Sequence, residues 1–162
     1  MHQVVRTRST LRAAVVVAVM LTLESLASAG PGRLRIGLID NAGGRYAAGC
    51  ACSLQLRSAK PASTVYVFLA EVANPETNRA WMRIDGEIVE LALVSSSPHS
   101  WQDRKGTRHS ETYRSGEISV RVDYVLTKPS LPGEELALYA ATITVTKAAR
   151  RATVRAVGEC GC

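Results

Sequence analysis

The sequence predicts an all-β domain, either an antiparallel sandwich or a closed barrel of about seven to nine strands, with its two ends joined by disulfides. Three observations predict it. Short runs that alternate apolar and polar residues recur along the chain and are separated by turn residues. No segment after residue 29 shows the 3.6-residue period of an amphipathic helix. Two Cys-x-Cys pairs, residues 50–52 and 160–162, lie near the two ends of this region.

The first 29 residues are predicted to be a secretory signal peptide. Arg6, Arg8 and Arg12 form its basic region, residues 13–23 are apolar, and residues 27–29 read Ala-Ser-Ala, a small-residue cleavage site. The apolar run has 11 residues, whereas a membrane-spanning helix needs roughly 20. We therefore expect a periplasmic or secreted protein with no transmembrane segment after cleavage.

Cleavage of this signal would leave 133 residues, enough for one domain with its own core. Loss of three arginines and one glutamate lowers the formal net charge from +6 to +4. Because there is no long cationic run, we expect no nucleic-acid partner, and the mild positive charge is compatible with anionic ligands of the cell envelope. We divide the remainder into a Gly-rich lead-in, residues 30–49, and a single β domain, residues 50–162.

The first half of the chain predicts an edge strand, a central strand and a hairpin. Residues 33–39 predict the short edge strand, and residues 65–72 are almost continuously apolar, which is typical of a central strand. Asp85-Gly86 stands between two apolar runs and predicts a two-residue type I′ hairpin, because both turn positions need positive φ. This turn places Ile84 opposite Glu87, Met82 opposite Val89 and Ala80 opposite Leu91.

The second half predicts two long strands with one inward face each. In residues 118–126 the inward positions are Ile118, Val120, Val122, Tyr124 and Leu126. In residues 136–146 they are Tyr139, Ala141, Ile143 and Val145. Between the hairpin and these strands, residues 107–113 predict a short edge strand within a polar connection.

The cysteine pairs are predicted to form two bridges. Residues i and i+2 of a strand share a face, so Cys50 and Cys52 share the apolar face of Leu54 and Leu56. Antiparallel pairing of this strand with the C-terminal one sets Cys52 opposite Cys160, Leu54 opposite Gly158 and Leu56 opposite Ala156. An even number of cysteines in an exported chain favours disulfides. We predict the bridges Cys50–Cys162 and Cys52–Cys160.

Two other uses of the cysteines stay open. Cys50, Cys52, Cys160 and Cys162 could together hold zinc or copper as a four-thiolate site. A strained Cys-x-Cys disulfide could also act as a thiol oxidant, although no helix N-terminus is evident to lower a thiol pKa. The main prediction is a structural staple with no resident cofactor.

The polar stretch at residues 97–116 carries the candidate partner-binding residues. Trp101, Arg104, Arg108 and His109 could form a contact surface, because exposed Trp and Arg dominate binding energy at interfaces. The alternative is a solvated connection with Trp101 packed over the core. Ser, His and Asp occur in this stretch without the framing of a catalytic triad, so we expect no enzyme.

The chain resembles a set of small exported bacterial proteins of unknown function. The shared motifs are Gly-Cys-x-Cys at residues 49–52, Trp-Met-x-Ile-Asp-Gly at residues 81–86 and Val-Gly-x-Cys-Gly-Cys at residues 157–162. The resemblance spans most of the chain after the signal and implies no activity.

The order of signal, cysteine, strand, Asp-Gly turn and Tyr-Arg-Ser-Gly, residues 113–116, is also similar to periplasmic inhibitors of c-type lysozyme. That resemblance implies a small eight-stranded barrel. The Ser-Gly-x-x-Tyr inhibitory loop of those proteins is not present in clean form, and a positive chain meets a basic lysozyme slowly. The function predicted from the sequence is therefore a non-catalytic binding or structural role in the cell envelope, with metal binding and lysozyme inhibition as alternatives.

Overall fold

The computed structural model describes residues 32–47, 49–58, 64–72 and 78–162, and every regular element in them is a β-strand. The predicted signal peptide lies outside the described residues. In the described part of the chain, no helix is long and apolar enough to cross a membrane. The strands are β1 (Ile36–Gly37), β2 (Ile39–Asp40), β3 (Ala51–Leu56), β4 (Val65–Tyr66), β5 (Phe68–Glu71), β6 (Arg79–Ile84), β7 (Glu87–Ser96), β8 (Arg108–Ser115), β9 (Ile118–Lys128), β10 (Leu136–Lys147) and β11 (Arg150–Gly161).

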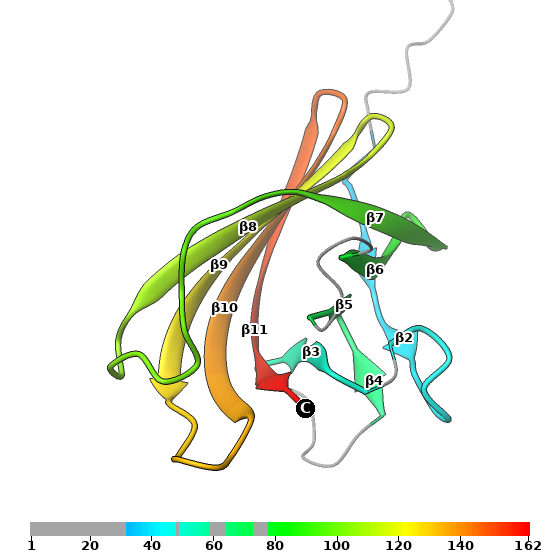
Figure 1. Cartoon of the computed structure of the whole chain (residues 1–162). Helices are drawn as coiled ribbons and strands as arrows, with labels where there is room; N and C mark the ends of the chain where they lie inside the picture. Colours follow the sequence, from blue (N-terminus) through cyan, green and yellow to red (C-terminus); the bar gives the residue numbers. More distant parts are fainter. Residues whose placement is uncertain (1–31, 48, 59–63, 73–77) are drawn as a thin grey trace, which may run out of the picture. The chain divides into compact units, whose positions relative to one another are not determined.

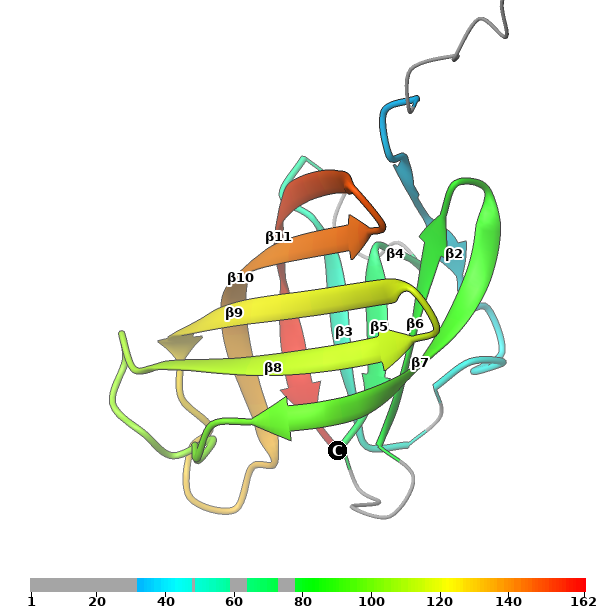
Figure 2. The same ribbon diagram turned by 90° about the horizontal axis from the view of Figure 1, so that it is seen from above.

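Eight of these strands form a closed antiparallel barrel. Their order is β6-β5-β3-β11-β10-β9-β8-β7, and pairing of β6 with β7 closes the ring. The long strands β8 to β11 curve side by side, facing β3, β5 and β6 (Figure 1), and the view from above shows the strands following one another around the core (Figure 2). The all-β prediction is confirmed, and the fold is the barrel and not the sandwich.

The β6–β7 hairpin follows the predicted register. Asp85 and Gly86 form its turn with φ values of 53° and 96°, as a type I′ turn requires. Its cross-strand pairs include Ile84 with Glu87, Met82 with Val89 and Ala80 with Leu91. The turn chemistry therefore determines which face of both strands enters the core.

The core consists of the inward faces of the barrel strands. The predicted inward positions of β9 and β10 are buried, and Leu54, Phe68, Met82 and Leu91 meet them from other strands. Complete burial of one such side chain contributes roughly 1.5–3 kcal/mol to folding. The interior near β8 differs, because it also holds the buried His109.

The lead-in contributes to the folded unit, which spans residues 31–162. β1 pairs with β6, and β2 pairs with β4 in a separate two-stranded sheet. Leu34 packs in the barrel core, whereas Ile39 packs outside the barrel wall with Leu69 and Trp81. The single edge strand predicted at residues 33–39 is instead two short strands, β1 and β2, which pair with different partners.

Asp85 ties the lead-in and two hairpins together. Its Oδ1 accepts the backbone amide of Arg35 at 3.1 Å, and its Oδ2 pairs with Arg150 Nη2 at 2.8 Å and Lys147 Nζ at 3.3 Å. The pKa of Asp85 is lowered mainly by the hydrogen bond from the Arg35 amide. Partial desolvation opposes this shift, and the two cations lower the pKa further. This contact lies at the end of β6 and β10 where the β6–β7 and β10–β11 turns meet.

The prediction of one central strand at residues 65–72 is wrong. The run divides into β4 and β5 at Val67, whose amide donates to the Leu54 carbonyl at 2.8 Å. The consecutive apolar residues Val67 to Ala70 are all buried, because Phe68 faces the barrel core while Leu69 faces the second cluster beneath the lead-in. A strand covered on both faces loses the alternation that a one-sided strand shows.

The prediction of a short edge strand at residues 107–113 is also wrong. β8 pairs with β7 on one side and with β9 on the other, so it belongs to the barrel wall. Its inward side chains are His109, Glu111 and Tyr113, which are polar or amphipathic. This inward polarity made the segment resemble a solvated edge.

The predicted staple is confirmed. Cys50 bridges Cys162 and Cys52 bridges Cys160, with sequence separations of 112 and 108 residues. β3 and β11 pair antiparallel with Cys52 opposite Cys160, as expected from the shared faces. The described chain has no free cysteine, so the four-thiolate alternative has no thiolate available in this state.

Gly158 gives a direct test of the β3–β11 seam. A Cβ at this position would meet the Ser53 carbonyl oxygen and would lie 2.9 Å from Leu54 Cα, so backbone would have to move. We expect Gly158→Ala to lower the free energy of unfolding by about 1–3 kcal/mol, the usual cost of overpacking. Urea denaturation measures the change. Gly32→Ala is the control, because a Cβ there meets nothing within 4 Å, and an equal loss in both variants would contradict the prediction.

Candidate functional site

A cavity of about 590 Å³ lies at the barrel end that carries the bridges. Strands β3, β5, β7 and β8 contribute to its wall, together with the β7–β8 and β9–β10 loops. Cys52 of the inner bridge is one of its lining residues. The staple therefore forms part of the cavity wall.

The cavity lining is acidic. It includes the four glutamates Glu71, Glu111, Glu134 and Glu135, and no lysine or arginine of the described chain lines it. The chain as a whole carries a formal net charge of +6. Negative charge is thus gathered in one concave place on a positive protein, where low-dielectric walls strengthen its field.

Backbone hydrogen bonds hold the two loops that contribute to the cavity. The Ser130 amide donates to the Trp101 carbonyl at 3.0 Å, which joins the β9–β10 loop to the β7–β8 loop. The Cys162 amide donates to the Glu135 carbonyl at 3.0 Å, which joins the outer bridge to the same β9–β10 loop. The positions of Trp101 and Glu135 consequently depend on the stapled C-terminus.

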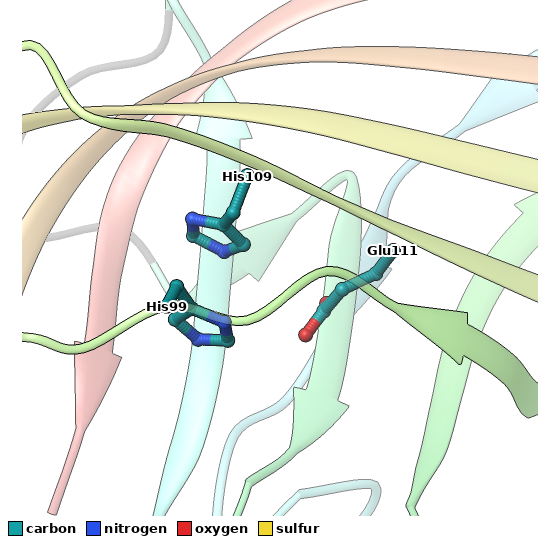
Figure 3. A group of neighbouring side chains, drawn as sticks. All are labelled: His99, His109 and Glu111. Atoms are coloured by element: carbon teal, nitrogen blue, oxygen red, sulfur yellow. The ribbon is translucent and has the colours of Figure 1, made fainter.

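Two histidines and a glutamate cluster at the cavity. His99 comes from the β7–β8 loop, and His109 and Glu111 come from the inward face of β8 (Figure 3). Their candidate ligand atoms all lie within 4.8 Å of one another. The two imidazole rings stack with centroids 3.7 Å apart and an interplanar angle of 4°. His99 is exposed and His109 is buried.

Phenol groups from two strands surround the cluster. Glu111 Oε2 accepts hydrogen bonds from Tyr113 Oη at 2.7 Å and from Tyr124 Oη at 3.0 Å. Burial is the main cause that raises the pKa of both phenols, and the Glu111 charge adds to it. Both hydroxyls therefore keep their protons and act as donors. The Tyr124 ring also stacks on His109, with centroids 4.4 Å apart.

Tyr139 completes the aromatic wall around His109. Its ring meets the imidazole edge-to-face at 5.4 Å. Its hydroxyl oxygen is buried and has no hydrogen-bond partner in the described part of the protein. Burial, followed by the charges of Asp103 and Glu111, raises the pKa of Tyr139 to about 12. A buried, unpartnered hydroxyl beside the cluster is a polar group that a bound ligand or water would satisfy.

The structure separates the four residues predicted to form a contact surface. Arg104 and Arg108 are exposed, as expected. Trp101 is partly buried against the core and lines the cavity. His109 is 7 % exposed and points into the barrel, so including it in an exposed surface was wrong. The alternation of β8 places His109 inward and Arg108 outward.

Sequence reasoning missed Glu111 and its two tyrosine partners. The pattern His109-x-Glu111-x-Tyr113 could have indicated this network, because every second residue of the strand has a side chain that can form hydrogen bonds. Tyr124 was correctly predicted to face inward, and the register sets it opposite His109. Recognising the network required knowing that β8 and β9 are neighbours in a closed barrel.

The buried imidazole predicts a pH-dependent stability. The pKa of His109 is lowered to about 4, mainly by burial and further by the neighbouring His99, while Asp103 opposes the shift. In the unfolded chain the group takes up its proton near pH 6.5. The buried neutral His109 therefore contributes fully to the free energy of unfolding above about pH 6.5. As the pH falls from about 6.5 to 4, this contribution is lost, and the free energy of unfolding drops by roughly 1–3 kcal/mol.

Urea denaturation of the wild type and of His109→Gln at pH 7.5 and pH 4.5 measures this dependence. The carboxylates titrate in both proteins, so the difference between their pH profiles isolates the histidine. We expect a smaller loss of stability on acidification in the variant. Two superimposable pH profiles would show that His109 does not contribute.

Comparison of the chain with protein-family models, curated proteins and solved structures finds no match. The role of the acidic cavity must therefore be inferred from the chemistry of its own side chains.

Proposed function

We propose that this protein is an exported, disulfide-stapled barrel that binds a small cationic ligand in the acidic cavity, without catalysis. The observation that carries the proposal is the lining of the cavity by Glu71, Glu111, Glu134 and Glu135 with no described lysine or arginine among them. A cation entering this space would be attracted by every charged side chain of the wall.

Two further residues of the cavity favour an organic cation such as an amine. Trp101 offers an aromatic ring, and ammonium groups are attracted to the face of indole. Asn78 also lines the cavity, and its Oδ1 is buried without a hydrogen-bond partner among the described residues. An N–H donor on a ligand would satisfy this oxygen.

The disulfides support the location that we propose, a periplasm or another extracytoplasmic compartment of the cell envelope. Disulfides persist in oxidising compartments and are rare in the cytosol. Both bridges are formed and no described thiol is free. The predicted signal peptide would deliver the chain to such a compartment.

Isothermal titration with spermidine and choline tests the proposed function, with glutarate as an anionic control. We expect at least one cation to bind at low ionic strength and glutarate not to bind. Glu134→Gln/Glu135→Gln removes two exposed charges at the cavity and is expected to weaken cation binding about tenfold or more, which is about 1.4 kcal/mol.

Glu117→Gln is the matched control, because Glu117 is exposed at the β8–β9 turn and does not line the cavity. Its affinity for the cation should equal that of the wild type. Equal affinities of Glu134→Gln/Glu135→Gln and Glu117→Gln would place the binding elsewhere, and failure of both cations to bind would reject the proposal.

A second candidate is inhibition of a c-type lysozyme, which one observation favours: the closed eight-stranded barrel is the architecture that the resemblance implies. Tyr113 is buried, so only Arg114, Ser115 and Gly116 of that motif could meet a partner. We expect an inhibitor to slow the lysozyme-driven clearing of a turbid cell-wall suspension in proportion to its concentration. Unchanged clearing with excess protein would exclude this role.

A further inference from the structure

The cluster of His99, His109 and Glu111 contains the side-chain types that bind transition metals. Their ligand atoms lie within 4.8 Å of one another, and the carboxylate points toward the two imidazoles (Figure 3). Around a zinc ion with bonds of about 2.0–2.2 Å, ligand atoms lie roughly 3.3–3.5 Å apart. The three ligand atoms are therefore close enough for one ion to reach all of them once the side chains reorient.

His109 is the buried member of the cluster. It is 7 % exposed, and its ring lies between the rings of His99 and Tyr124, with the ring of Tyr139 at its edge. Tyr139, whose ring meets this imidazole edge-to-face, carries a buried hydroxyl oxygen that has no hydrogen-bond partner among the described residues. Buried polar groups in proteins nearly always have a partner, so this hydroxyl points to a ligand or an ordered water beside His109.

His99 offers its Nε2 atom to a ligand. Its Nδ1 lies 3.2 Å from the Ser97 carbonyl oxygen, which can only accept, so Nδ1 carries the proton of that hydrogen bond. Nε2 of the neutral ring then has a free lone pair. A ligating histidine usually donates its other N–H to a carbonyl or carboxylate in this way.

Glu111 is oriented by its phenol donors. Tyr113 and Tyr124 both donate to Oε2, which leaves Oε1 for a further contact. Hydrogen bonds of this kind to a ligating carboxylate are typical of the groups that surround metal ligands. The two tyrosines would thus position the carboxylate whether or not an ion is bound.

One rearrangement is required. The two imidazole rings are nearly parallel, so the in-plane lone pairs of His99 and His109 run side by side and do not meet at one point. His99 is exposed and lies in the β7–β8 loop, so its ring is the one that can turn toward the carboxylate. Breaking the stack is therefore part of the binding event.

We propose that His99, His109 and Glu111 bind one divalent transition-metal ion, with zinc as the best match, at the inner wall of the acidic cavity. Two imidazoles and a carboxylate suit zinc, whereas magnesium and calcium select oxygen ligands. The proposal deepens the proposed function, since His99 and Glu111 line the same cavity, and it rests on cation binding there.

Zinc titration of the untagged, disulfide-bonded chain tests the proposal. Calorimetry and native mass spectrometry in metal-free buffer should show one zinc ion per chain and no comparable binding of magnesium. The cysteines cannot contribute, because all four are bridged. In the ¹H–¹⁵N spectrum of the imidazoles, zinc should shift the resonances of both His99 and His109.

His99→Ala is the decisive variant, because an exposed loop residue can be truncated without disturbing the fold. We expect it to weaken zinc binding by about 100-fold or more, since changes even outside the ligand set cost 10–100-fold. Lys105→Ala, an exposed change in the same loop, should bind zinc as the wild type does.

Spermidine titration of the same samples separates this inference from the proposed function. Absence of zinc binding, or equal zinc affinities of the wild type and His99→Ala, would overturn the metal site. If spermidine still binds in that case, the cavity proposal stays intact. Failure of the wild type to bind zinc, spermidine and choline would reject both proposals. Zinc binding that disappears in His99→Ala while spermidine binding persists would support the metal site.

Discussion

Removal of both disulfides is expected to lower the free energy of unfolding by about 4–5 kcal/mol, because in the chain-entropy model a bridge that closes a loop of about 100 residues contributes about that much. Cys50–Cys162 and Cys52–Cys160 close loops with sequence separations of 112 and 108 residues. A loss of this size is a large share of the stability of a typical domain. Urea denaturation with and without a phosphine reductant measures it.

The contributions of the two bridges to stability should not be additive. Either bridge alone closes nearly the same loop, so Cys50→Ala/Cys162→Ala is expected to cost well under half of the full loss. The inner bridge is buried and lines the cavity, so Cys52→Ala/Cys160→Ala should additionally weaken spermidine binding. If removing the outer pair alone were as costly as removing both, the loop-closure explanation would be wrong.

The parts of the fold that could be predicted from the sequence are those determined by local chemistry. Asp85-Gly86 sets the register of β6 and β7 because few dipeptides adopt two positive φ values. The bridge pairing followed from alternation and an antiparallel register of the two terminal strands, because a slip of one residue would turn every cysteine to the other face. Neither inference needed knowledge of what covers the other face of these strands.

The parts that could not be predicted depend on what covers a strand. Residues 65–72 divide into two strands because the lead-in adds a second apolar cluster outside the barrel, where Leu69 packs against Ile39. Nothing within the run itself marks the division. β8 was taken for an edge because a wall strand is expected to point apolar side chains inward, and this one points His109 and Glu111.

The orientation of the candidate partner-binding residues could not be predicted for the same reason. The polar stretch at residues 97–116 does contain the histidines and Trp101 of the cavity, so its composition was informative. Its direction was misread, because Glu111 points inward only when β8 is closed between β7 and β9. The glutamates of the β9–β10 loop come from a separate part of the chain and join the site only through the fold.

Replacement of Glu111 by leucine is expected to destabilise the barrel by about 2–5 kcal/mol. The carboxylate accepts from both Tyr113 and Tyr124, and the two hydroxyls would be left in the barrel without an acceptor. Each unsatisfied buried donor costs about 1–3 kcal/mol, and leucine has a similar volume, so packing changes little. Urea denaturation in the presence of a metal chelator measures the cost independently of any bound ion.

A triple variant isolates the hydrogen bonds from the shape of the side chain. Glu111→Leu/Tyr113→Phe/Tyr124→Phe removes the acceptor together with both donors, and exchange of partners for apolar groups of the same shape can be nearly neutral. We therefore expect the triple variant to recover most of the stability that Glu111→Leu loses. If the triple variant were no more stable than the single one, the loss of stability in Glu111→Leu would come from packing. The hydrogen bonds between the phenols and the carboxylate would then not contribute to stability. Recovery would instead mean that Glu111 is held in the barrel by its two donors, with Oε1 left for a cation in the cavity.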